Sequence, residues 1–144
     1  MNKPKNTMKV SFPSRGANEG LARMLIAAFV TEADPTVEEL CDIKTAVSEA
    51  VTNCIVHAYP DRIGEIYIAA ALSENNLLTV KVRDHGCGIA DVEQAMEPLY
   101  TTGGSERAGL GFAVMQSFMD KVSVRSAPGR GTRVTLTKHL EDSS

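Results

Sequence analysis

The clearest candidate for chemistry is the pattern Asp-x-Gly-x-Gly formed by Asp84, Gly86 and Gly88, which follows an alternating apolar run at 77–82. The alternation predicts a strand, so Asp84 is expected where that strand ends. Glycines permit backbone angles closed to other residues and let the chain pass close to a flat ligand. A carboxylate there can accept a hydrogen bond from an exocyclic amine such as that of adenine. The same residue types are also typical of a plain turn, so this pattern alone leaves both interpretations open.

A second candidate pair is Glu49 and Asn53, which lie four residues apart in a stretch with helical periodicity. On a helical projection the two lie side by side, opposite the apolar stripe of the same helix. Magnesium prefers oxygen ligands and takes few of them from protein, so the side-chain carbonyl of Asn53 suits this ion. The alternative is an ordinary solvated helix face.

A second glycine pattern, Gly109-Leu110-Gly111, precedes an amphipathic helix and follows Arg107. Backbone N–H groups at the start of a helix favour anions such as phosphate. The pattern by itself is not specific, and Arg107 alone fits an ordinary solvated loop charge.

Taken in order, Glu-x3-Asn, Asp-x-Gly-x-Gly and Gly-x-Gly before a helix resemble the N, G1 and G2 boxes of the GHKL ATPase/kinase superfamily. Segments 48–53, 98–102 and 131–140 also look like the bacterial anti-sigma factor kinases, most closely those of sporulation. The resemblance covers roughly residues 8–140. It implies the GHKL (Bergerat) ATP-binding fold.

The resemblance also implies a role for each matching residue. Asp84 is then the adenine anchor, Glu49 the general base, and Asn53 the magnesium ligand. Arg107 contacts the γ-phosphate, and Arg23, which is expected to be exposed on the first helix, serves partner contacts. The remaining implied nucleotide contacts are Gly86, Gly88, Thr101, Thr102, Gly109, Leu110, Gly111 and Thr132.

The implied activity is that of an anti-sigma factor and protein serine kinase. It would bind ATP or ADP with Mg²⁺, hold a sigma F-like sigma factor, and phosphorylate a serine on an anti-anti-sigma factor. The resemblance also suggests a homodimer formed through the exposed first strand. Two alternatives stay open: a general stress-response anti-sigma kinase, and a nucleotide-gated binding module without phosphoryl transfer.

Only residues 1–7 precede the first expected strand, which leaves no room for a helical hairpin bearing a phospho-acceptor histidine. The acceptor is therefore expected on another protein.

Composition argues against several other classes of protein. A chain of 144 residues with 43% hydrophobic residues is expected to form a single domain spanning 1–144. Its net charge of −3 and lack of a basic cluster argue against direct nucleic-acid binding. No stretch is apolar enough to cross a bilayer, and the N-terminus lacks a signal peptide core. The cysteines Cys41, Cys54 and Cys87 are widely spaced, which favours a reduced, cytoplasmic protein without a zinc site.

The expected elements are a strand at 8–12, a helix capped by Ser14 or Asn18, and a helix starting at Thr36. Strands follow at 65–72 and 77–83, then a long lid at 85–108, a helix at 110–119, and a hairpin of 122–125 with 132–137. This order predicts a two-layer α/β sandwich with a mixed, largely antiparallel sheet and helices on one face. The buried face of the first helix is expected to comprise Leu21, Met24, Leu25, Ala28 and Phe29, and that of the second Leu40, Ile43, Val47, Val51 and Cys54.

Other reactive residues receive structural interpretations. His57 is expected to pack or to lie as a cation near a helix C-terminus, and His85 is given no role. Cys87 is expected to line the pocket as a small side chain. Met115 and Met119 are expected in the core.

Overall fold

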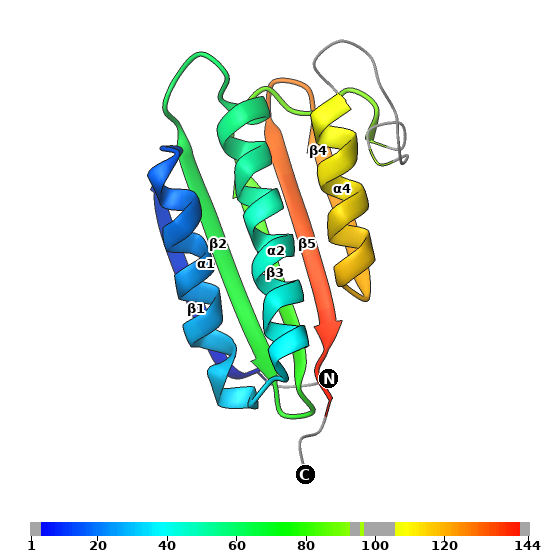
Figure 1. Cartoon of the computed structure of the whole chain (residues 1–144). Coiled ribbons are helices and arrows are strands. Elements are labelled where there is room, and N and C mark those ends of the chain that lie inside the picture. Colours follow the sequence, from blue (N-terminus) through cyan, green and yellow to red (C-terminus); the bar gives the residue numbers. More distant parts are fainter. Residues whose placement is uncertain (1–3, 93–95, 97–105, 142–144) are drawn as a thin grey trace.

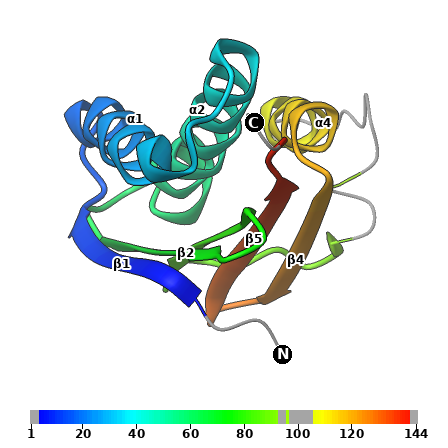
Figure 2. The same ribbon diagram turned by 90° about the horizontal axis from the view of Figure 1, so that it is seen from below.

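An open five-stranded sheet carries the helices on one face, as Figures 1 and 2 show. The computed structural model describes residues 4–92, 96 and 106–141, and for 106–110 the backbone only. The strands are β1 (Pro4–Pro13), β2 (Glu65–Ser73), β3 (Leu77–Asp84), β4 (Lys121–Ala127) and β5 (Gly131–His139). The helices are α1 (Ala17–Val30), α2 (Val37–Asn53) and α4 (Glu106–Phe118), with a 3₁₀ turn η1 (Thr31–Ala33) and a π-helical turn η2 (Cys54–Ala58).

The strand order is β1-β2-β3-β5-β4, and every pairing is antiparallel. The expected mixture of directions is therefore wrong in detail, while the two-layer arrangement is confirmed. The chain enters β5 only after α4 and β4, so β3 and β5 become neighbours across a long sequence separation. Their register places Asp84 opposite Thr132.

The second helix supplies the centre of the core. Ile43, Val47 and Val51 of α2 are fully buried, as predicted from their spacing, whereas Leu40 is only half-buried. Met115 and Met119 are also buried, as expected. In Figure 2, α2 lies between α1 and α4 over the sheet, and it packs against both.

Of the residues expected on the buried face of α1, Phe29 is buried and Leu25 is half-buried, but Leu21, Met24 and Ala28 are exposed. The helix buries Ala22, Ile26, Phe29 and Val30. Leu21 and Met24 instead point outward, and Met24 is 72% exposed. Apolar residues occur on more than one face of this helix, so periodicity alone did not select the correct one.

The cap expected for α1 is also wrong. Gly16 occupies the N-cap position and makes no side-chain hydrogen bond there. The Ser14 hydroxyl accepts from the Gly64 N–H at 2.9 Å, while the Asn18 amide donates to the Pro13 carbonyl at 2.9 Å. Both side chains therefore tie the start of α1 to neighbouring segments.

The hairpins β2–β3 and β4–β5 form where they were predicted. The helix α4 starts at Glu106, so Gly109 and Gly111 lie inside it and not before it. Much of the predicted lid, including Thr101 and Thr102, lies outside the described residues. Within the described part of the chain, no helix is long and apolar enough to cross a membrane.

A capping box starts α2, as the sequence predicts. The Thr36 hydroxyl accepts from the Glu39 N–H at 3.0 Å, and the Glu39 carboxylate accepts from the Thr36 N–H at 2.9 Å. The second carboxylate oxygen of Glu39 accepts from the Glu141 N–H at 2.8 Å. The helix start is thereby joined to the end of the described chain.

Replacing Thr36 by Ala should lower the free energy of unfolding by about 1 kcal/mol, because it removes the cap of α2. Urea denaturation followed by circular dichroism measures this change. Thr45→Ala is the control, since Thr45 is exposed within the same helix and should stay within about 0.5 kcal/mol of the parent. Equal effects of the two substitutions would contradict the capping assignment.

Candidate functional site

A pocket of about 400 Å³ opens between α2, η2 and the adjoining ends of β3 and β5. Its polar lining comes from Asn53, Asp84 and Thr132 together with His57 and Cys54, and the rest is largely apolar. The apolar lining residues are Ala50, Val56, Ala58, Pro60, Ile89, Phe112 and Val134, with Gly88. A concave, mostly apolar site with a few converging polar groups is typical of small-molecule binding.

Asp84 is the buried acid of this pocket, with a relative exposure of 4%. Its Oδ1 accepts from the Gly86 N–H at 2.9 Å and from the Thr132 N–H at 3.2 Å. Its Oδ2 accepts from the Cys54 thiol at 3.5 Å. A carboxylate has about four acceptor positions, so these three donors leave capacity on Oδ2 for a ligand.

The glycines around Asp84 are required by the protein backbone itself. A Cβ on Gly86 would lie 2.3 Å from the Ala58 carbonyl oxygen. Gly88 has a φ of +77°, and a Cβ there would lie 2.1 Å from the carbonyl oxygen of Ala127. Side chains at either position would force the loop away from η2 or from the β4–β5 turn, so the Asp-x-Gly-x-Gly pattern is fixed by close packing.

The loop after Asp84 is fastened on two sides. The Cys87 N–H donates to the carbonyl oxygen of Ala58 at 3.1 Å, and the Gly129 N–H donates to the carbonyl oxygen of Cys87 at 2.7 Å. The Cys87 thiol is directed to the His57 carbonyl at 3.0 Å. Cys87 is exposed and is not among the residues lining this pocket, so the expectation that it lines the pocket is wrong.

Glu49 and Asn53 meet α4 at Gly111. A Cβ on Gly111 would lie 3.2 Å from Asn53 Oδ1 and 3.3 Å from Glu49 Oε2. Because Gly111 has no side chain, α4 leaves room for the Glu49 carboxylate and the Asn53 amide together. Asn53 Nδ2 is buried and has no hydrogen-bond partner among the described residues. A buried amide donor beside a pocket is in a position to bind a ligand.

Thr132 contributes more than its sequence position suggested. Besides the backbone bond to Asp84, its hydroxyl lies 2.8 Å from the Ser126 hydroxyl. Ser126 also accepts from the Ile89 N–H at 2.7 Å, so it connects the loop after Asp84 to the β4–β5 hairpin. Sequence reasoning missed Ser126, Cys54 as a donor to Asp84, and Gly131, whose φ is +105°. Only the glycine before Thr132 offered a signal.

The structure thus brings together Glu49, Asn53, Asp84, Gly86, Gly88, Gly111 and Thr132. Arg107, Gly109 and Leu110 lie in the first turns of α4, but their side-chain contacts are not described. Arg23 lies apart on α1, where it is 47% exposed and forms an ion pair with Glu19 at 3.3 Å.

His57 and His85 lie in different environments. His57 lies in η2 and lines the pocket. The His85 ring packs edge-on against Tyr67, with ring centroids 5.3 Å apart. The backbone N–H of His85 donates to the Tyr59 hydroxyl at 2.6 Å.

Comparison with known proteins is consistent with this geometry. Residues 12–138 match the family described as histidine kinase-like ATPase domain. The anti-sigma F factor of Caldanaerobacter subterraneus subsp. tengcongensis is 55% identical over 94% of each chain, and that of Bacillus subtilis is 47% identical over 96% of each.

This chain belongs to the anti-sigma F factor family. Two solved structures share its fold at low sequence identity. The RsbU and RsbW domains of a Mycobacterium tuberculosis protein give a TM-score of 0.71 at 21% identity, over 95% of this chain and 33% of that one. A histidine kinase domain from Erythrobacter litoralis gives 0.55 at 22% identity, over 85% and 61%. The GHKL fold predicted for this anti-sigma F family member is confirmed, and its ATPase domain implies nucleotide binding.

Asp84→Asn should weaken both ATP and ADP binding, because an amide offers a ligand amine one acceptor oxygen in place of two and can present its NH₂ group instead. Calorimetric titration with each nucleotide measures the change. Unaltered affinity in a variant that keeps its circular dichroism spectrum would show that Asp84 does not contact the nucleotide.

Gly111→Ala should reduce nucleotide affinity roughly tenfold, because its methyl group must displace the side chains of Asn53 and Glu49 by a few tenths of an ångström. The matched control is Gly20→Ala in α1, where a Cβ would meet nothing within 4 Å. The control should bind nucleotide normally and gain helix stability. Normal affinity in Gly111→Ala would show that the α2–α4 contact does not position the site.

Proposed function

We propose that this chain is an anti-sigma factor with protein serine kinase activity. It binds and inhibits a sporulation sigma factor of the sigma F type in the cytoplasm. It uses Mg-ATP to phosphorylate a serine on an anti-anti-sigma factor, which is thereby inactivated. The observation that carries this proposal is the pocket that combines the buried Asp84 carboxylate with Asn53, next to Glu49.

The pocket suits an adenine base. Asp84 Oδ2 retains an acceptor position for the exocyclic amine, and Thr132 and Gly88 line the same space. Phe112, Val134 and the other apolar lining residues supply contact for the faces of the ring. Both ATP and ADP present this base, so both should bind.

The residues present also fit a magnesium ion. Asn53 offers a side-chain carbonyl oxygen, and its Nδ2, which has no hydrogen-bond partner among the described residues, can donate to a phosphate oxygen. Magnesium typically takes one or two protein oxygens and completes its shell with phosphates and water. When bound, the ion would neutralise charge on the phosphates.

Phosphoryl transfer then depends on Glu49. The acceptor serine oxygen attacks the γ-phosphorus, the bond from that phosphorus to the β–γ bridging oxygen breaks, and ADP leaves. The serine proton passes to the Glu49 carboxylate, which acts as general base. Arg107 would stabilise the charge that spreads over the transferred group. Thr101, Thr102 and the segment Gly109 to Gly111 would surround the phosphates.

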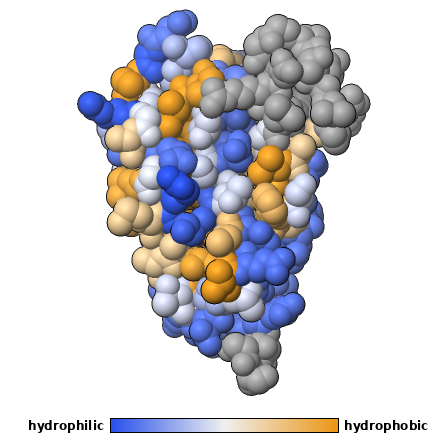
Figure 3. Space-filling model, viewed as in Figure 1, coloured by the Kyte–Doolittle hydropathy of each residue, from blue (hydrophilic) through white to orange (hydrophobic). Residues whose placement is uncertain are grey.

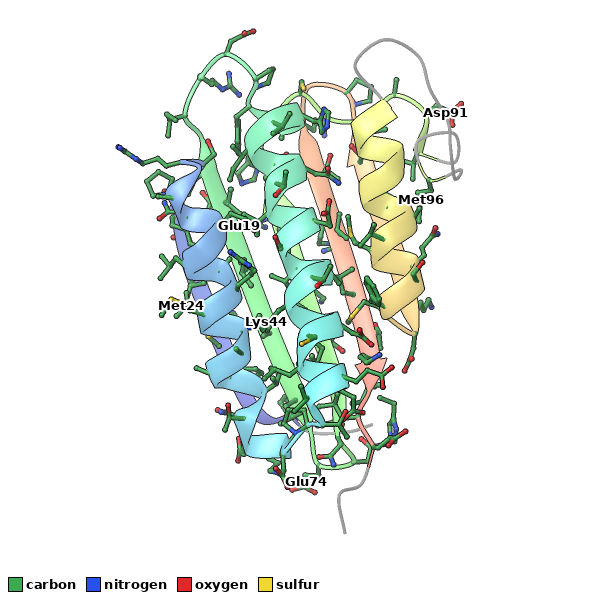
Figure 4. The ribbon with its side chains drawn as sticks, in the orientation of Figure 1. Glu19, Met24, Lys44, Glu74, Asp91 and Met96 are labelled. Atoms are coloured by element: carbon green, nitrogen blue, oxygen red, sulfur yellow. The ribbon has the colours of Figure 1, made fainter. Side chains whose placement is uncertain are left out.

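The outward face of α1 supports a protein contact there. Met24 and Leu21 are exposed beside Arg23, and all three line a shallow hollow with Lys44 of α2. In Figure 4, Met24 projects from the outer side of α1 while Glu19 lies between α1 and α2. Figure 3 shows hydrophobic residues mixed with hydrophilic ones along this side of the molecule. A sigma factor held through Arg23 fits this mixed surface.

A homodimer through β1 is also part of the proposal. Among the described residues, this strand lies at the edge of the sheet and pairs with β2 alone. Its other edge presents unpaired backbone groups, which a second copy can use.

Labelled ATP tests the proposal directly. The chain is incubated with magnesium, γ-labelled ATP and the candidate anti-anti-sigma factor. We expect acid-stable label on a serine of that protein. Nucleotide-dependent sigma binding without any label transfer would identify a nucleotide-gated binding module instead.

Glu49→Ala and Asn53→Ala should fail in different ways. Glu49→Ala should still bind Mg-ATP and the sigma factor while phosphorylating about 10² to 10⁴ times more slowly, since it removes only the base. Asn53→Ala should lose Mg-ATP affinity, nucleotide-dependent sigma binding and phosphorylation together. Calorimetry, sigma pull-down and label transfer on both variants separate these patterns. A wild-type transfer rate in Glu49→Ala would remove Glu49 from the mechanism.

A further inference from the structure

Cys54 is the one thiol of this chain that contacts the candidate base pocket. It follows directly after α2, is 4% exposed, and lines the pocket together with Asp84. Its sulfur lies 3.5 Å from Asp84 Oδ2, the oxygen that the backbone donors leave open. The motifs of the sequence give this residue no role.

The thiol acts as a donor in this position. The sulfur lies within hydrogen-bond distance of Asp84 Oδ2, and an ionised carboxylate can only accept, so the thiol is the donor. A thiol is a weak donor, so it adds little binding energy to the carboxylate, and its main effect is on the orientation of the carboxylate.

The three donors around Asp84 limit what a ligand can offer. Oδ1 is occupied by the Gly86 and Thr132 N–H groups, and Oδ2 by the Cys54 thiol. What remains is an acceptor position on Oδ2. A ligand edge that brings a hydrogen-bond donor there is favoured, whereas one that brings an acceptor places two oxygens against each other with no proton between them.

We propose that Cys54 is a specificity-determining positioning residue: it orients the Asp84 carboxylate so that the pocket takes a 6-aminopurine and rejects a 6-oxopurine. The inference rests on the nucleotide pocket proposed above and adds to it a role for a residue outside the three sequence boxes.

Paired substitutions at Cys54 test the proposal. Alanine and serine have similar volumes, so Cys54→Ala and Cys54→Ser differ chiefly in whether a donor remains. Each variant is titrated with ATP and with inosine triphosphate, which carries a 6-oxo group in place of the 6-amino group. In Cys54→Ala the ratio of the two affinities should fall roughly threefold to tenfold, the range expected for one hydrogen bond. In Cys54→Ser it should stay within about twofold of the parent.

Other outcomes overturn the inference. An unchanged ratio in Cys54→Ala, or the same fall in both variants, means that the donor does not set specificity. A merely structural role would lower the affinity for both nucleotides equally and leave their ratio intact.

Two further measurements keep the test decisive. In the Cys41→Ser/Cys87→Ser background Cys54 is the remaining thiol, and its infrared S–H stretch should lie below the frequency of a thiol in an apolar solvent. A stretch at the free-thiol frequency contradicts the hydrogen bond even if Cys54→Ala does not fold. Asp84→Asn distinguishes a failure of the proposed nucleotide pocket from a failure of the role proposed for Cys54. If it binds ATP normally, the proposed pocket is wrong; if it loses ATP while Cys54→Ala keeps the parental ratio, only the role of Cys54 is wrong.

Discussion

The site depends on one buried carboxylate. Asp84 ends β3 on the helix side of the sheet, and an acid in that position is stable only if its oxygens are satisfied. The Gly86 and Thr132 N–H groups satisfy one of them, so the loop after β3 and the start of β5 must both approach closely. Gly131 permits that approach, since a Cβ there would lie 2.2 Å from the Asp84 carbonyl oxygen. The pairing of β3 with β5 and the shape of the pocket therefore follow from the same requirement.

The second constraint is the contact between α2 and α4. Gly111 gives Glu49 and Asn53 space beside α4, while Phe112, the next residue, is buried and lines the pocket. Two consecutive residues of α4 thus lie beside the Glu49–Asn53 pair and in the lining of the pocket. Because α2 also packs against α1, the site and the proposed partner surface around Arg23 share a common support.

Sequence reasoning predicted the elements whose signals are local. The capping box at Thr36, the two hairpins and the α2 stripe all depend on residues close together in the chain, and the structure contains them. The errors arose where the tertiary structure decides. α1 has apolar residues on two faces, and only packing against α2 and the sheet selects Ala22 and Ile26. Gly111 looked like a helix start but serves a close approach between helices. The donors to Asp84 from Cys54 and Thr132 come from distant segments and have no local pattern.

The proposed site requires that Asp84 accept a hydrogen bond from the amino group of a bound adenine. A crystal structure of the chain with magnesium and a non-hydrolysable ATP analogue tests it most directly. We expect the exocyclic amino nitrogen to lie within hydrogen-bond distance of Asp84 Oδ2, with Asn53 directed at the phosphates. An adenine bound elsewhere, or bound here with its amino group turned away from Asp84, would contradict it.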